Sequence, residues 1–147
     1  MKEYAVNRKA SFDYQIETTY EAGMELLGFE VKSIRLGRMN LSGAFANPRG
    51  SEIWLTNGSI PSYQPQNTPR GYDPERPRRL LLHKSEIAEL TGRMRQASLT
   101  LIPLRVYSKN RQIKLLLGLG RRKKKFDKRE TIKRRDTDRE VQRTLAD

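Results

Sequence analysis

Apolar and polar residues alternate along much of the chain, and this period of two predicts a mainly β protein. The clearest signal lies in residues 113–119, where every second side chain is isoleucine or leucine. Another apolar run covers residues 99–106, and the polar residues 108–111 between the two runs are typical of a tight turn. Together these segments predict a β-hairpin.

Weaker alternation predicts further strands nearer the N-terminus. Residues 12–17 alternate between apolar and polar side chains, beginning with Phe12. Residues 24–29 resume an extended apolar run after Gly23, which we expect to form a bulge. Residues 45–56 predict two short strands joined by a tight turn.

Two segments have the three- and four-residue spacing of apolar positions that an amphipathic helix requires. The first covers residues 30–36, presents a cationic polar face and ends at Gly37. The second follows Ser85, which is a favourable N-cap residue. Its apolar face consists of Ile87, Leu90 and Met94.

About six strands, two helices and no alternating βαβ pattern predict a closed antiparallel β-barrel with two or three short helices over residues 1–119. An OB-like barrel is favoured because such barrels bind nucleic acid on one face. An SH3-like barrel or a small sandwich would fit the same pattern.

Residues 61–79 hold five of the seven prolines and predict a long irregular loop, which in a compact domain is usually functional or mobile. The loop is also cationic, through Arg70, Arg76, Arg78 and Arg79. These side chains would suit RNA, but a solvated irregular segment explains them equally well.

The formal net charge of the 147 residues is +13, and residues 121–135 contribute ten basic and two acidic side chains to it. This segment has only Phe126 and Ile132 as large apolar groups, which is too little to offset the entropy of folding. We therefore expect residues 120–147 to form a basic tail that is disordered in isolation. Such a dense positive charge favours a polyphosphate partner over a merely solubilising role.

The chain has no cysteine, so no disulfide framework or thiolate metal site is expected. Its first residues lack the apolar run of a signal peptide, and no stretch is long enough to span a bilayer. We expect a soluble, cytoplasmic and monomeric protein that does not bind membranes.

Catalytic signals are weak. His83 is the single histidine, and no phosphate-cradling glycine loop accompanies it. We expect His83 to be structural or to donate a hydrogen bond to RNA rather than to act as a general base. Converging acids would be required for a magnesium-dependent nuclease, and the candidates are Asp13, Glu17, Glu21 and Glu30. Their spacing does not predict convergence, so we expect a binding protein without catalytic residues, metal or cofactor.

Five segments stand in an order that is specific as a set. They are residues 7–10 (Asn-Arg-Lys-Ala), 20–23 (Tyr-Glu-Ala-Gly), 28–35 (Gly-Phe-Glu-Val-Lys-Ser-Ile-Arg), 80–84 (Leu-Leu-Leu-His-Lys) and 123–129 (Lys-Lys-Lys-Phe-Asp-Lys-Arg). Together they resemble the signature blocks of the small protein B family (SmpB, the SsrA-binding proteins).

The resemblance implies an RNA-binding factor of trans-translation with an OB-type barrel. Such proteins hold the tRNA-like domain of transfer-messenger RNA (tmRNA, or SsrA RNA). They bring it, with elongation factor Tu on the aminoacylated tmRNA, to ribosomes stalled without a stop codon. The tail enters the empty mRNA channel and decoding region of the small subunit. The nascent peptide is then tagged for degradation and the ribosome is released.

The resemblance also assigns residues by position. The implied RNA-binding residues are Asn7, Arg8, Lys9, Glu21, Lys32, Arg35, Arg38, His83, Lys84, Arg121, Arg122, Lys123 and Lys124. The implied ribosome-binding tail residues are Phe126, Asp127, Lys128, Arg129, Lys133, Arg134 and Arg135. Cations would contact phosphates and 2′-hydroxyls. Phosphate would repel the Glu21 carboxylate, so Glu21 would shape the face or accept a hydrogen bond from a base or 2′-hydroxyl.

The chain departs from the family pattern at two positions. Many relatives have histidine where this chain has Phe12, so stacking would replace a polar contact there. A glycine usual at the start of the tail is replaced by Arg122, and we expect Gly118 and Gly120 to supply that flexibility. Composition alone fits a constitutive ribosomal protein or a general RNA-binding or chaperone protein equally well.

Overall fold

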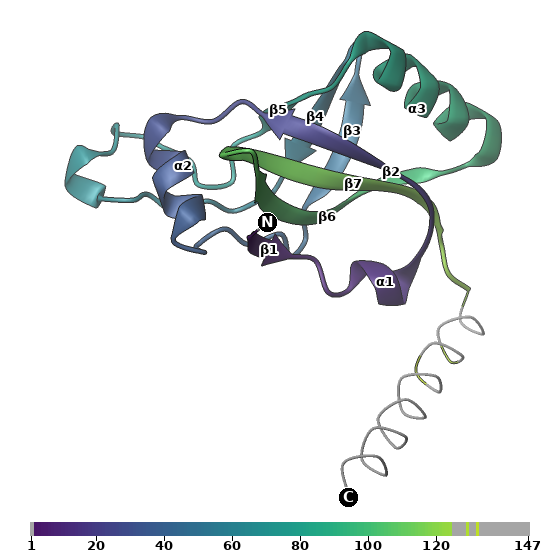
Figure 1. The fold of residues 1–147 in the computed structure, drawn as a ribbon, viewed down its shortest axis with the longest axis horizontal. Helices are drawn as coiled ribbons and strands as arrows, with labels where there is room; N and C mark the ends of the chain where they lie inside the picture. Colours follow the sequence, from purple (N-terminus) through teal and green to yellow (C-terminus); the bar gives the residue numbers. More distant parts are fainter. Residues whose placement is uncertain (1, 125–128, 130–131, 133–147) are drawn as a thin grey trace, which may run out of the picture.

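The computed structural model describes residues 2–124, 129 and 132, and seven antiparallel strands form its sheet (Figure 1). The strands are β1 (Glu3–Val6), β2 (Tyr14–Met24), β3 (Phe45–Arg49), β4 (Glu52–Thr56), β5 (Arg78–Leu81), β6 (Thr100–Lys109) and β7 (Gln112–Arg122). The helices are α1 (Ala10–Asp13), α2 (Gly28–Arg35) and α3 (Lys84–Ala97), with a 3₁₀ turn at Pro65–Asn67. The mainly β prediction is confirmed.

The predicted closure of the barrel is wrong, because the sheet has two edges. Its strand order is β1-β6-β7-β2-β5-β4-β3, and β1 and β3 are not hydrogen-bonded to each other. Pro103 of β6 lies at this open seam and lacks the N–H that a ladder needs. Its carbonyl accepts a hydrogen bond from the Asn7 side chain at 2.9 Å instead of from a strand.

The predicted hairpin is present as β6 and β7. Its turn residues Asn110 and Arg111 both have positive φ, 51° and 66°, as a two-residue type I′ turn requires. β2 pairs along the other edge of β7, with a register shift between Ile16 and Thr18. These long strands place the hairpin at the centre of the sheet.

The prediction that residues 12–17 and 24–29 are extended is only partly correct, because each segment includes helical residues. A helical turn covers Ala10–Asp13, so β2 begins only at Tyr14. Side-chain alternation does not reveal this turn, which is held by backbone hydrogen bonds from Phe12 and Asp13 to the carbonyl of Lys9.

Both long helices begin earlier than predicted, because glutamates cap them. Glu30 Oε1 accepts the backbone N–H of Leu27 at 2.8 Å, and α2 begins at Gly28. Glu86 Oε1 likewise accepts the N–H of His83 at 3.1 Å, so His83 is the N-cap of α3 in place of the predicted Ser85.

Most core residues come from the strands, and helices α2 and α3 lie at opposite ends of the curved sheet (Figure 1). α2 contributes Ile34 and α3 contributes Leu90, and both side chains are fully buried. Strands β6 and β7 supply Leu101, Val106, Leu115, Leu117 and Leu119. In the part of the chain that the structure describes, no helix is long and apolar enough to cross a membrane.

Strand β7 continues to Arg122, beyond the boundary expected after Leu119. Gly118 and Gly120 therefore lie inside the sheet and are not a hinge. A Cβ on Gly120 would lie 2.2 Å from the carbonyl oxygen of Gln15, so only glycine allows β2 to approach here. These glycines serve strand packing.

Candidate nucleic-acid interface

Glu21 lies on the outer face of the central strands, inside a small polar network. The hydroxyl of Tyr107 donates a hydrogen bond to Glu21 Oε2, and Lys109 Nζ lies 3.4 Å from both carboxylate oxygens. The Tyr107 hydrogen bond lowers the pKa of Glu21. Burial, together with the Glu21 carboxylate, raises the pKa of Tyr107 to about 12. Glu21 is thus held ionised between partners, as a residue that shapes a surface would be.

His83 meets Glu21 across a shallow hollow of about 460 Å³. Lys114 of β7 also lines this hollow, and Leu81 and Leu82 give it apolar walls. Three elements separated in sequence, β2, β7 and the β5–α3 junction, therefore converge here. Lys84 is exposed at the start of α3.

Helix α2 adds its cationic face beside the hairpin tip. Arg35 donates a hydrogen bond to the carbonyl of Arg111 at 3.0 Å. Lys32 lies over the ring of Tyr63, with Nζ 5.6 Å from the centroid, and Arg38 donates to the Tyr63 carbonyl at 3.4 Å. Lys32 and Arg35 of α2 and Arg38 beyond its end are exposed, and within the described residues none pairs with a carboxylate.

The hairpin supplies further cations that sequence reasoning missed. Lys109, Arg111 and Lys114 lie next to the predicted residues Glu21, Arg35 and His83. The signal that could have found Lys114 is its polar position in the alternating run of β7. Its proximity to Glu21 depends on the pairing of β2 with β7, which only the fold supplies.

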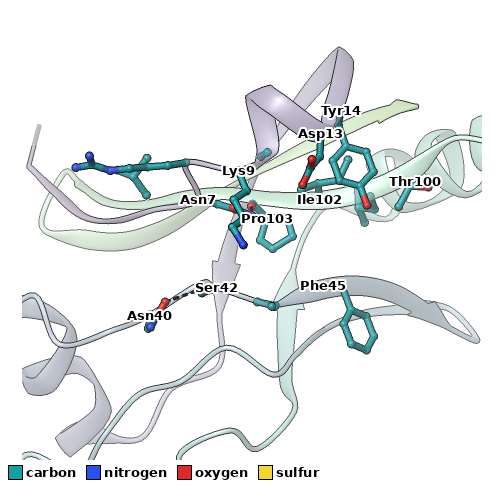
Figure 2. Close-up of a pocket in the computed structure, with 16 residues that line it drawn as sticks. Asn7, Lys9, Asp13, Tyr14, Asn40, Ser42, Phe45, Thr100, Ile102 and Pro103 are labelled. Atoms are coloured by element: carbon teal, nitrogen blue, oxygen red, sulfur yellow. Dashed lines mark hydrogen bonds between the residues drawn. The ribbon is translucent and has the colours of Figure 1, made fainter. Parts of the chain in front are cut away.

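The sequence-predicted Asn7, Arg8 and Lys9 lie elsewhere, near the beginning of β6. Asn7 is half-buried, and both its backbone and side-chain N–H groups are bound by carbonyls of β6. Arg8 and Lys9 are exposed and line a cleft at the open seam (Figure 2). The structure therefore divides the predicted RNA-binding residues of the body between two places.

Two of the four arginines expected in the proline-rich loop, Arg76 and Arg78, have a structural role. Glu30 is fully buried, and its carboxylate pairs with Arg76 at 2.5 Å and with Arg78 at 2.6 Å. The hydroxyl of Tyr72 lies 2.8 Å from Glu30 Oε2. Arg78 is buried too, and it also donates to the carbonyl of Gly58 at 2.7 Å. These contacts attach the loop to α2.

Burial and these hydrogen-bond partners together determine the pKa of Glu30. Burial opposes ionisation, but hydrogen bonds from Arg76, the Leu27 backbone, Arg78 and Tyr72 outweigh it and lower the pKa to about 2. Burial and the adjacent carboxylate raise the pKa of Tyr72 to about 12. Both arginines of this network are thus held against the single Glu30 carboxylate inside the protein.

The acids considered for a magnesium site do not converge. Glu30 is occupied by arginines, and Glu21 by Tyr107 and Lys109. Glu17 lies 2.5 Å from Arg121 and 3.8 Å from Arg93. Among the described residues, no three histidine or acidic side chains gather in a way that could hold a metal ion. The geometry gives the nuclease alternative no support.

Comparison with known proteins decides the family. The family model described as SmpB protein matches residues 4–147. This chain belongs to the SmpB family. An SsrA-binding protein of Halalkalibacterium halodurans is 49% identical over 146 residues, which cover 99% of this chain and 94% of that protein. An SsrA-binding protein of Thermosynechococcus vestitus is 48% identical over 145 residues, covering 99% and 95%.

A solved structure described as "tmRNA-SmpB: a journey to the center of the bacterial ribosome" resembles this fold. The TM-score is 0.66 and the identity 45%, over 82% of this chain and 84% of that one.

Beyond the end of β7, Lys123 lies beside α1. The backbone N–H of Lys123 donates to the carbonyl of Asp13 at 2.8 Å, and its side chain donates to the carbonyl of Ser11 at 2.9 Å. Arg121 and Arg122, assigned to the tail from sequence, are part of strand β7. Arg129 is exposed. The other predicted tail residues lie outside the described part, namely Phe126, Asp127, Lys128, Lys133, Arg134 and Arg135.

Proposed function

We propose that this chain is an RNA-binding factor of trans-translation that binds the tRNA-like domain of tmRNA. It brings this RNA, with elongation factor Tu, to ribosomes stalled without a stop codon. Its basic tail then occupies the empty mRNA channel, so that the nascent peptide is tagged and the ribosome released. The proposal places the protein in the cytoplasm and requires no reaction catalysed by the chain itself.

The observation that supports the proposal is which positively charged side chains lack a carboxylate partner among the described residues. Among the described residues, the exposed cations of α2, of the hairpin tip and of the α3 start form no salt bridge with a carboxylate, except for Lys109, which lies near Glu21. Exposed, uncompensated cations attract a phosphate backbone, and their binding releases its counterions. A carboxylate inside such a surface is suited to accept hydrogen bonds from base edges or 2′-hydroxyls.

The proposal gives the tail a role separate from that of the body. Residues 125–147 follow the end of β7, and the contacts of Lys123 with α1 belong to the body. A chain that ends after Lys124 therefore keeps every described strand. We propose that this body recognises tmRNA and that the tail acts on the ribosome.

The test measures binding of the full chain and of the chain ending at Lys124 to the tmRNA tRNA-like domain over a salt series. An ordinary tRNA is the competitor. Both chains should prefer the tmRNA domain, with a steep salt slope that is only slightly shallower without the tail. Tagging on stalled ribosomes should require the full chain. Loss of selectivity on truncation would refute the division between body and tail.

A constitutive ribosomal protein is the alternative from a different class. It would occur in equal amounts on translating and on stalled ribosomes. The proposed factor should instead be enriched on ribosomes stalled on mRNA without a stop codon. Quantitative immunoblotting of the two ribosome populations separates the two functions.

A further inference from the structure

The proline-rich loop is closed at its base and held against helix α2. The backbone N–H of Ile60 donates to the carbonyl of Pro74 at 2.9 Å, so the two ends of the loop lie side by side. The hydroxyl of Tyr72 lies 2.7 Å from the carbonyl oxygen of Ile60. The Tyr72 ring packs edge-on against the ring of Phe29 in α2, with the centroids 4.7 Å apart. Together with the ion pairs of Glu30, these contacts fix the base of the loop relative to α2.

Tyr63 lies three residues beyond this base, in a stretch whose backbone is restricted. Pro61 and Pro65 stand two positions before and two positions after it, and each proline ring fixes its own φ. Gln64, which precedes the second proline, is extended, with φ −136° and ψ 113°. The half-buried Tyr63 ring is therefore presented at a defined place beside α2.

Tyr63 contacts two of the exposed cations through different groups. Its ring lies under Lys32, whose Nζ is 5.6 Å from the ring centroid. Its carbonyl accepts a hydrogen bond from a guanidinium nitrogen of Arg38 at 3.4 Å. Lys32 belongs to α2, whereas Arg38 lies beyond the end of the helix. One residue of the loop thus holds a cation in the helix and another that follows it.

These contacts order the two cations without neutralising them. An aromatic ring attracts an ammonium group through its quadrupole, and a carbonyl attracts a guanidinium through its dipole, but neither carries a net charge. Arg79 differs, because it pairs with the carboxylates of Glu25 and Glu52. A lysine that is already ordered loses less rotamer freedom when it binds a phosphate. A tyrosine beside Lys32 therefore lowers the cost of binding and leaves the positive charge intact.

We propose that Tyr63 is a positioning residue for RNA binding, which holds Lys32 and Arg38 in place for a phosphate backbone. The ring acts on Lys32 and the main chain acts on Arg38, so a side-chain substitution tests the first contact alone. The inference rests on the proposed function, since it adds a residue that prepares the cationic surface of that RNA-binding factor. Direct stacking of the ring on a base is a different role, and a double-mutant cycle separates the two.

The first experiment measures the affinity of the full chain for the tmRNA tRNA-like domain over a salt series. Tyr63→Ala should weaken binding by about two- to tenfold, the effect of having to order one long side chain on binding. The salt slope should stay unchanged, because Lys32 still reaches the phosphate. Tyr63→Phe keeps the ring and should retain the affinity of the unaltered chain. Ser62→Ala, a substitution at the neighbouring residue of the same loop, is the matched control and should leave the affinity unchanged.

A double-mutant cycle shows which residue Tyr63 acts through. In a Lys32→Ala background the ring has no ammonium group to hold, so Tyr63→Ala should have no further effect on affinity. In an Arg35→Ala background Tyr63→Ala should weaken binding as it does in the unaltered chain. The reason is that Arg35 donates to the carbonyl of Arg111 and shares no partner with Tyr63.

NMR of the protein without RNA gives a second readout. The ring current of Tyr63 should shift the side-chain methylene protons of Lys32 upfield. This shift should disappear in Tyr63→Ala and persist in Tyr63→Phe.

The positioning role is overturned if Tyr63→Ala leaves the affinity unchanged, or if it weakens binding equally with and without Lys32. The second result would assign the ring to direct contact with a base. The role is also overturned if Tyr63→Phe fails to retain the affinity, or if the Lys32 protons show no ring-current shift. The proposed function fails by a different result, namely equal binding of the tmRNA domain and ordinary tRNA by the unaltered chain. Coupling between Tyr63 and Lys32 combined with equal binding would keep the positioning role and reject the function.

Discussion

Arg78 and Arg79 are neighbours in strand β5, but the fold uses them in opposite ways. Arg78 points inward, is fully buried and binds Glu30 at 2.6 Å. Arg79 points outward and pairs with Glu25 at 2.7 Å and Glu52 at 3.4 Å, with all three side chains partly in solvent. The first arginine holds the proline-rich loop in place, whereas the second covers a surface.

A third group of cations differs from both. Lys32 and Arg35 of α2 and Lys9 beside α1 are exposed and have no carboxylate within the described part of the chain. Their charge remains available to a partner. We propose from this comparison that positive charge marks function only where the fold places no acid beside it. The predictions below test this difference.

The largest effect is expected on removing the buried arginine. Arg78→Ala removes the buried one of the two arginines that pair with the Glu30 carboxylate, which should lower the free energy of unfolding by about 3–5 kcal/mol. Arg79→Ala, one residue along the same strand, should lower it much less, because water already solvates its pair. Urea denaturation of both variants measures the difference. Equal losses would mean that burial does not distinguish the two arginines.

The pH dependence of stability also tests the role of the buried Glu30 carboxylate. The folded pKa of Glu30 is about 2, below its ordinary value of 4.5. Its ionised form therefore stabilises the fold above pH 4.5, and this contribution, up to about 3 kcal/mol, is lost as the pH falls from 4.5 toward 2. Glu30→Gln should be less stable at pH 7 and should lose less on acidification. Parallel pH profiles of the variant and the unaltered protein would contradict the assignment.

Substitution of the exposed cations should affect RNA binding rather than stability. Lys32→Ala and Arg35→Ala should leave thermal stability nearly unchanged but weaken binding to the tmRNA domain. Each should reduce the salt slope of binding by about one, if each contacts one phosphate. Arg49→Ala is the matched control outside this surface. A melting temperature that falls together with affinity would show that these residues are structural.

The smallest effect is expected near the end of strand β7. Arg121→Ala removes an exposed pair with Glu17, so the free energy of unfolding should change by at most about 1 kcal/mol. Denaturation at low and at high salt measures it, and any difference should disappear at high salt. A loss comparable with that of Arg78→Ala would place Arg121 among the structural arginines.

Local patterns in the sequence determined a good part of this protein. The alternation in residues 113–119 and the turn before it predicted the β6–β7 hairpin, because side-chain period and turn residues are properties of a few adjacent positions. The ordered motif blocks predicted the family, which the comparisons confirmed. The clustering of charge near the C-terminus is likewise visible without a structure.

Only the tertiary structure decided which charged side chains pair with an opposite charge and where the sheet ends. Glu30 and Arg78 are 48 positions apart, and no local pattern relates them. At the open seam Asn7 binds the carbonyl of Pro103 across 96 positions, a contact that no local pattern indicates, and the predicted closure was wrong. Both outcomes depend on contacts between distant segments. Such contacts are selected by the packing of the whole chain, whereas periodicity and turn signals report only on neighbouring residues.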